Sequence, residues 1–134
     1  MSGWQLFFVA MAIWNLGAAL PGLMAPRRGF RLLYGVDTDR FYELYQHWVI
    51  SAVILLYGIS YAIVALDPAS NLGLVFFGIL GKLFFVLVVV TLFVRKKVTL
   101  VALAMGVCDA AFAVFFARYL MGSVFFINEL VGGG

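Results

Sequence analysis

The fold of this chain is decided by residues 71–121, NLGLVFFGILGKLFFVLVVVTLFVRKKVTLVALAMGVCDAAFAVFFARYLM. This stretch holds two long apolar runs, each with one charge near its middle, joined by the basic turn 95–97. Lys82 lies fourteen residues before Lys96 and Asp109 lies thirteen residues after it, so two antiparallel helices joined here would set both charges about 20 Å from the turn. That depth is well inside a hydrocarbon layer about 30 Å thick, where a lone charge is costly. The segment therefore predicts two membrane-spanning helices held by an ion pair between Lys82 and Asp109.

The composition of the whole chain agrees with a membrane environment. Of its 134 residues, 66% are hydrophobic and 11% are charged, whereas about 25% of residues are charged in soluble domains. These few charges cannot cover a soluble globule, and four apolar runs are long enough to span a bilayer. We therefore predict an all-α integral membrane protein with a single domain, 1–134, folded as an antiparallel bundle of four transmembrane helices at about 4–24, 40–66, 72–94 and 98–121.

The basic residues indicate how the chain is oriented. Seven of the nine lysines and arginines fall in the first and third connections, whereas the second connection, 67–71, has none. Because cytoplasmic loops carry an excess of lysine and arginine, we expect the first and third connections in the cytoplasm and both termini on the outer, periplasmic side. The first run lacks the basic start of a signal peptide, so we expect a retained helix. Basic residues placed between spans also give no reason to expect nucleic acid as a partner.

Few residues of the chain offer catalytic or metal-binding chemistry. The single cysteine, Cys108, excludes a disulfide framework and a Cys-x-x-Cys redox centre. The sequence lacks a nucleophile paired with a base and a cluster of metal ligands, so we expect neither an enzyme nor a metal site. A calcium site at Asp37, Asp39 and Glu43 is an alternative, but the glycine and further ligands of an EF-hand loop are missing. The segment Asp37-Thr38-Asp39 is more simply explained as the N-terminal cap of the second span, with acids suited to the positive end of its dipole.

Further polar side chains are expected beside the ion pair. Asn15 is the polar residue of the first span and lies on a face of small residues, which lets helices approach closely. Glycine and alanine also flank Lys82 and Asp109. The second span carries tyrosines that we expect to face the interior of the bundle as well. We therefore predict a shared polar core near mid-membrane, formed by Lys82, Asp109, Asn15, Tyr57 and Tyr61.

The connections between the spans are rich in residues suited to the membrane surface. The first connection, 26–35, mixes three arginines with Phe30, Leu32, Leu33 and Tyr34, which is typical of a short segment lying in the headgroup layer. Together with the third connection it supplies the candidate contacts to lipid headgroups, Arg27, Arg28, Arg31, Arg95, Lys96 and Lys97. At the opposite end we expect a second interfacial collar, formed by Arg118, Tyr119, Asn128 and Glu129.

The only histidine, His47, has three interpretations. It shares a face with Ser51 and Gly58, so we expect it to point into the bundle. A single histidine can ligate haem or a pigment, or relay protons together with Glu43. The simpler interpretation is an interfacial histidine that is hydrogen-bonded to Glu43 or to a neighbouring backbone group, and we prefer it because no second ligand is evident. No cofactor is therefore predicted.

Part of the chain resembles a group of small bacterial membrane proteins. The likeness rests on residues 57–68 (YGISYAIVALDP), residues 78–82 (GILGK), Asp109, and residues 115–120 (FFARYL). This set resembles small uncharacterised four-helix proteins that are loosely DoxX-like, and it covers the second to fourth spans. The resemblance implies the fold and a bacterial inner (cytoplasmic) membrane rather than a reaction. It also implies that Lys82 and Asp109 belong to a shared pattern.

Two functions fit these features. In the first, the chain is an accessory or scaffold subunit of a larger membrane complex, such as an electron-transfer or photosynthetic assembly, and Lys82 and Asp109 form a static pair that fixes helix register. In the alternative, it is a small oligomeric transporter or proton-coupled carrier, in which the two charges exchange partners as protons move. Buried pairs more often fix register, so we prefer the first. The expected partners are membrane lipids and other membrane subunits or a second copy.

Overall fold

The computed structural model describes the backbone of residues 1–132 and the side chains of residues 1–125. Within this part the chain is all-helical, and four of its helices are long and apolar enough to cross a membrane. The prediction of four helices with the length and composition of membrane spans is thus confirmed, and these helices indicate a membrane protein. The elements are α1 (Gly3–Met24), α2 (Pro26–Tyr34), α3 (Phe41–Leu66), α4 (Leu72–Val94) and α5 (Leu100–Gly132).

The ends of α1 and α2 follow from local sequence. Ser2 and Gln5 form a capping box at the start of α1, in which each side chain accepts a hydrogen bond from the other residue's backbone N–H. At the other end, Pro21 lies inside the last turn of α1, and Pro26 opens α2 at a position where proline loses no helical hydrogen bond. Gly35 ends α2 with a left-handed backbone, φ 73°. The segment predicted to lie at the membrane surface is therefore a separate short helix.

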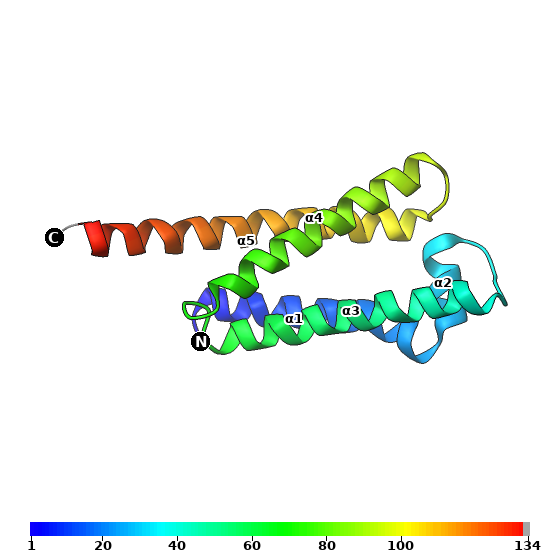
Figure 1. Cartoon of the computed structure of the whole chain (residues 1–134), viewed down its shortest axis with the longest axis horizontal. Helices are drawn as coiled ribbons and strands as arrows, with labels where there is room; N and C mark the ends of the chain where they lie inside the picture. The colour runs from blue at the N-terminus through cyan, green and yellow to red at the C-terminus, as the bar shows by residue number, and fades with distance from the viewer. Residues whose placement is uncertain (133–134) are drawn as a thin grey trace.

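The long helices pack as two pairs. Helix α1 packs along α3 and α4 packs along α5, while α3 also contacts α4, and α2 contacts α1, α3 and α5. Figure 1 shows that the start of α1, the connection between α3 and α4, and the far part of α5 lie toward one end. Helix α2 and the turn between α4 and α5 lie toward the other end. The two basic connections therefore share one end of the molecule.

Helix α5 is longer than the sequence pattern predicts. It runs from Leu100 to Gly132, 33 residues or about 50 Å, and extends past the other helices in Figure 1. The helix continues past the expected end near Met121 because no proline or turn sequence interrupts it there. Within this part of the helix the Ser123 hydroxyl donates a hydrogen bond to the Tyr119 carbonyl at 3.0 Å. The predicted collar residues Asn128 and Glu129 have side chains outside the described residues.

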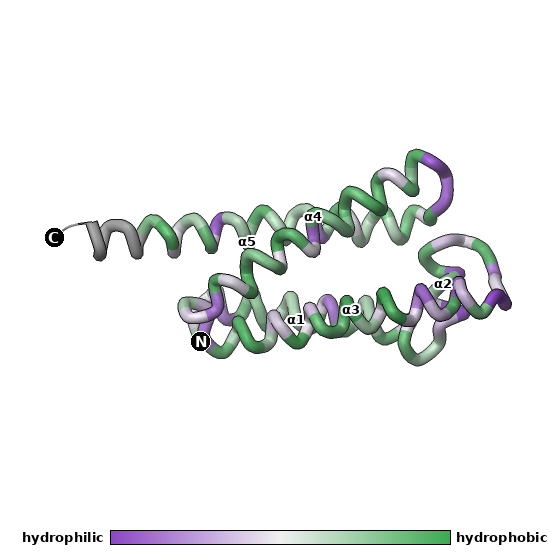
Figure 2. Tube along the Cα trace, viewed as in Figure 1, coloured by the Kyte–Doolittle hydropathy of each residue, from purple (hydrophilic) through white to green (hydrophobic). Residues whose placement is uncertain are grey.

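A compact group of buried side chains joins the two helix pairs. Phe8 from α1, Tyr61 from α3 and Phe116 from α5 are fully buried, and Val75 from α4 packs into the same cluster. The centre of the Phe116 ring lies 5.2 Å from the centre of the Phe8 ring and 5.0 Å from that of the Tyr61 ring, and both pairs pack edge to face. Outside this cluster most large apolar side chains are exposed, and the hydrophilic residues gather mainly in the connections (Figure 2). Lipid is the solvent that suits such a surface.

Candidate functional site

The two opposite charges of the apolar hairpin meet as predicted. Lys82 of α4 and Asp109 of α5 form an ion pair with 2.7 Å between Nζ and Oδ1. The side chain of Lys82 is 3% exposed and that of Asp109 is 14% exposed. The pair forms because α4 and α5 are antiparallel and the two residues stand nearly the same number of residues from the turn. The predicted salt bridge is therefore confirmed.

Aromatic rings surround the buried ammonium group. Lys82 Nζ lies 5.3 Å from the ring centre of Phe112, 5.4 Å from that of Tyr61 and 5.9 Å from that of Phe116. The faces of such rings attract a cation, and the attraction is stronger where water is absent. The rings come from α3 and α5, so the lysine of α4 is bound on two sides. The charge is thus enclosed by one carboxylate and three rings.

Two glycines let α4 approach the tyrosines of α3. A β-carbon added at Gly78 would lie 2.7 Å from the Phe116 ring and 2.8 Å from the Tyr61 ring. One added at Gly81 would lie 2.7 Å from the ring of Tyr57. Such distances are too short for real carbon contacts, so these positions accept only glycine without a shift of the rings. Tyr57 therefore packs against the backbone beside Lys82, and Tyr61 lies against its ammonium group.

Asn15 belongs to a different seam from the one the sequence suggests. Its side-chain amide donates a hydrogen bond to the Ile54 carbonyl at 3.2 Å, and Gly58 brings the backbone of α3 against it. Asn15 is buried between α1 and α3, and its hydrogen bond goes to that carbonyl rather than to Lys82 or Asp109. The structure thus brings Tyr61 and Asp109 to Lys82, while Asn15 fastens the other helix pair.

His47 lies buried where α1, α2 and α3 meet. It is 4% exposed, and neither ring nitrogen has a hydrogen-bond partner among the residues that the structure describes. A β-carbon added at Gly22 would lie 3.0 Å from Nε2, and one added at Gly29 would lie 2.8 Å from it. The rings of Phe30 and Tyr34 approach the imidazole with centres 5.8 and 6.0 Å away. The histidine is therefore sealed under α2 by two glycine backbones and two aromatic edges.

The surroundings of His47 bear on the three interpretations of this residue. The expected hydrogen bond to Glu43 or to a backbone group is wrong, because both ring nitrogens are unpartnered. Haem ligation requires open space along the bond to the ring nitrogen for a planar macrocycle. The backbones at Gly22 and Gly29 occupy the side that Nε2 faces, so the arrangement does not fit such a group there. Burial raises the pKa of the neighbouring Tyr34 phenol, which keeps that group neutral.

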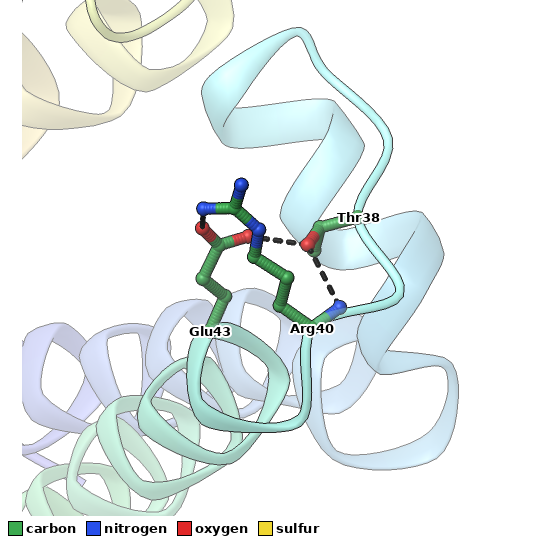
Figure 3. Close-up of polar contacts among 3 residues, drawn as sticks. All are labelled: Thr38, Arg40 and Glu43. Atoms are coloured by element: carbon green, nitrogen blue, oxygen red, sulfur yellow. Dashed lines mark hydrogen bonds and ion pairs between the residues drawn. The ribbon is translucent and has the colours of Figure 1, made fainter.

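The carboxylate of Glu43 binds residues of the loop that precedes α3. It accepts a hydrogen bond from the Thr38 hydroxyl and pairs with Arg40, with 3.4 Å between Nη1 and Oε1 (Figure 3). The Thr38 hydroxyl also accepts a hydrogen bond from the Arg40 backbone N–H at 3.1 Å. The loop is closed by these contacts, and they do not include His47. Glu43 and His47 stand one turn apart on α3, but among the described residues they make no hydrogen bond to each other.

The acids before α3 bind arginines instead of capping the helix. Asp39 pairs with Arg27, and Asp37 pairs with Arg31 at 3.7 Å. The N-cap position is Arg40, which makes no side-chain cap hydrogen bond. The two acids of the predicted cap therefore do not cap α3, because the chain reverses after α2 and brings that helix's arginines close to both carboxylates. Thr38, the third residue of the predicted cap, accepts a hydrogen bond from the Arg40 backbone N–H at the start of the helix. Two of the six candidate headgroup contacts are thus paired within the chain.

Several residues of these sites escaped the sequence patterns. Phe112 and Phe116 enclose Lys82, yet in sequence they are ordinary apolar residues of a span; their spacing of three and seven residues after Asp109 is the only signal. Thr99 links α2 to α5 through hydrogen bonds to Leu32 and Leu33. No sequence signal identifies this link, because it joins residues that are distant along the chain.

These features define a class of protein. The chain is a small helical membrane protein with four candidate spans, a buried Lys82 and Asp109 ion pair and a sealed histidine beneath a short helix. Compared with known proteins, it matches no protein-family model, no curated protein and no solved structure.

Proposed function

We propose that the chain is an accessory or scaffold subunit of a larger complex in a bacterial inner membrane, for example an electron-transfer or photosynthetic assembly. The observation that carries this proposal is the enclosure of Lys82, which is 3% exposed and surrounded by Asp109 and three aromatic rings. A charge that carries protons or substrate needs access to water on at least one side. A charge that fixes two helices in register needs none, so the geometry favours a structural role.

Two surface hollows of the molecule lie away from this pair. An open hollow of about 390 Å³ lies between α1 and α3 and is lined mostly by apolar residues. A second hollow of about 480 Å³ lies between the first turns of α1 and Phe115. Neither is lined by Lys82 or Asp109. This placement supports the scaffold over the transporter, which remains the alternative function.

The exposed stripe of α4 is the proposed contact face for another subunit. Its large side chains recur at three- and four-residue intervals on the side away from Lys82, and all are about half exposed or more: Phe76, Phe77, Leu80, Leu83, Phe84 and Leu87. Aromatic side chains supply much of the contact energy at protein interfaces. Three phenylalanines on a helix that must face lipid or protein make this stripe the best candidate.

Photocrosslinking in native membranes tests the proposal. A benzoyl-phenylalanine at Phe84, which is 69% exposed, is expected to give one discrete protein adduct after irradiation and mild detergent extraction. The matched control carries the same group at Leu6, which is 55% exposed on α1. Adducts to lipid alone at both positions would contradict the subunit role.

A flux measurement separates the alternative function. Vesicles containing the wild-type chain and a pH-sensitive dye are expected to show the same proton leak as vesicles containing the double variant Lys82→Met and Asp109→Asn. A proton flux that is present in the wild type and lost in the double variant would favour the proton-coupled carrier.

The orientation and the family likeness also belong to this proposal. Helix pairs that run antiparallel place α2 and the turn 95–97 at one end of the molecule (Figure 1), and the concentration of cations there supports a cytoplasmic location for that end. Both termini would then be periplasmic. The likeness of residues 57–120 to small DoxX-like proteins is consistent with this arrangement and adds no reaction to it.

A further inference from the structure

The two basic connections are fastened together by one threonine. The backbone N–H of Thr99 donates to the Leu33 carbonyl at 2.8 Å, and its hydroxyl donates to the Leu32 carbonyl at 2.7 Å. The same hydroxyl accepts a hydrogen bond from the Ala102 N–H at 3.4 Å, which caps the start of α5. The last turn of α2 is thus hydrogen-bonded to Thr99, which lies two residues after Lys97 in the chain. The arginines of α2 and the cations of the turn therefore belong to one surface of the molecule, at the hydrophilic end seen in Figure 2.

The cations of this surface fall into two groups. Its seven lysines and arginines face three acids, each of which pairs with an arginine: Asp37 with Arg31, Asp39 with Arg27 and Glu43 with Arg40. The remaining four cations make no ion pair with a carboxylate in the part of the chain whose side chains are described, and all are exposed: Arg28, Arg95, Lys96 and Lys97. Internal pairing therefore leaves four positive charges for something outside the chain.

Lys96 is held in a backbone conformation that disfavours lysine. Its φ is 55°, and the turn closes α4 with hydrogen bonds from Lys96 N–H to the Phe93 carbonyl and from Lys97 N–H to the Leu92 carbonyl, each 2.9 Å. This pattern normally ends in glycine, because a side chain in the left-handed region costs about 1 kcal/mol. Helix α2 follows the usual rule with Gly35. Folding alone would therefore favour glycine over lysine at position 96.

We propose that Arg28, Arg95, Lys96 and Lys97 form a binding site for the headgroup of an anionic phospholipid. The apolar sequence of α4 reaches Val94, so the turn stands where the hydrocarbon ends and lipid phosphates lie. A phosphate diester is the anion that this depth supplies, and each basic residue near the surface contributes about 1 kcal/mol to its attraction. Four uncompensated cations on two connections that Thr99 links match that chemistry. This inference requires a membrane protein and does not depend on the subunit role.

Thermal unfolding with added lipid tests this site. The purified chain in a neutral detergent is titrated with phosphatidylglycerol or with phosphatidylcholine, and the rise in Tm is followed. Phosphatidylglycerol is expected to raise Tm further. Lys96→Gly is expected to unfold at the same or a higher Tm without lipid, because the backbone strain is relieved. The same variant should need about five times more phosphatidylglycerol for half of the Tm rise, since one cation is lost.

Matched variants separate this site from the overall charge. Arg118→Gln removes one exposed charge at the opposite end and should keep the wild-type response to phosphatidylglycerol. The pair Arg31→Gln and Asp37→Asn removes an internally paired cation without a net charge change and should also keep it. An unchanged response in Lys96→Gly, or an equal loss in Arg118→Gln, would overturn the proposal. So would equal stabilisation by soluble glycerol phosphate, which would indicate a free phosphate site.

Discussion

Lys82 is stable inside an apolar bundle because its charge is met from several directions. The carboxylate of Asp109 lies 2.7 Å away, and the rings of Phe112 and Tyr61 lie beside the ammonium group. Burying two charges is expensive, and their attraction repays this only when the geometry is good. Removing one partner is therefore expected to do more harm than removing both.

A double-mutant cycle measures this dependence. Lys82→Met alone leaves a buried carboxylate unpaired and is expected to lower the free energy of unfolding by about 3 to 5 kcal/mol. Asp109→Asn alone should have a similar effect, and the double variant should recover most of the loss. The measurement is unfolding of the detergent-solubilised chain by added SDS. Independent, additive losses in the two single variants would show that the pair does not hold α4 to α5.

His47 is the second unusual residue. Neither of its ring nitrogens has a hydrogen-bond partner in the described part of the chain, and an unpaired buried polar group typically costs about 1 to 3 kcal/mol. Its position is set by α2, whose Phe30 and Tyr34 cover it and whose Gly29 lies against Nε2. The burial of His47 therefore depends on how α2 packs against α1 and α3.

At the scale of elements, α2 is docked through a glycine contact. A β-carbon at Gly29 would lie 2.8 Å from His47 Nε2 and 3.0 Å from the backbone of Gly22. The α1 backbone cannot yield as a flexible side chain would. The approach of α2 to α1 and α3 therefore depends on the absence of a side chain at this position.

Gly29→Ala is accordingly expected to loosen α2 from the bundle. We expect a loss of about 1 to 3 kcal/mol in the free energy of unfolding, because overpacking at a rigid contact forces the helices apart. Faster hydrogen exchange across Pro26–Tyr34 would locate the change. The control is Gly17→Ala in α1, where an added β-carbon meets nothing within 4 Å. Its hydrogen exchange across α2 should match the wild type, and its stability should be equal or slightly higher because alanine is the better helix former. Wild-type exchange in Gly29→Ala would contradict this account of α2.

At the scale of the whole molecule, the two helix pairs are joined mainly by the aromatic cluster around Phe8, Tyr61 and Phe116. The pair of Lys82 and Asp109 stands beside this cluster, since Tyr61 and Phe116 take part in both. Figure 1 shows α4 diverging from α3 toward the end that carries α2 and the turn 95–97. At that end the hydrogen bonds of Thr99 provide the link.

Cysteine labelling of intact bacterial cells tests the proposed orientation of the whole molecule. In a Cys108→Ala background, Ser70→Cys lies in the connection between α3 and α4 and should react with a membrane-impermeant maleimide. Lys97→Cys lies in the opposite connection and should react only after the membrane is permeabilised, because the cation-rich end is expected in the cytoplasm. The reverse pattern would place the termini in the cytoplasm.

The sequence by itself determined the spans and the ion pair. Whether a run of residues is long and apolar enough to cross a bilayer is a local property. The depth of Lys82 and Asp109 followed from the helical rise and their nearly equal distances from the turn, so one short connection was enough to bring them together. The length of α5 was underestimated, because the apolar pattern weakens after Met121 while the backbone has no reason to break.

Only the tertiary structure decided which polar groups meet. The depth of Asn15 in the membrane would have allowed it to face Lys82. Because α1 packs on α3, its side-chain amide instead donates a hydrogen bond to the Ile54 carbonyl. Asp37 and Asp39 precede α3 in the sequence as cap residues would, yet the chain reverses after α2 and both acids form ion pairs with arginines of that helix. The enclosure of Lys82 by rings and the sealing of His47 likewise depend on which helices touch and at what angle. Such contacts join residues far apart in the chain, and neither helical periodicity nor composition contains that information.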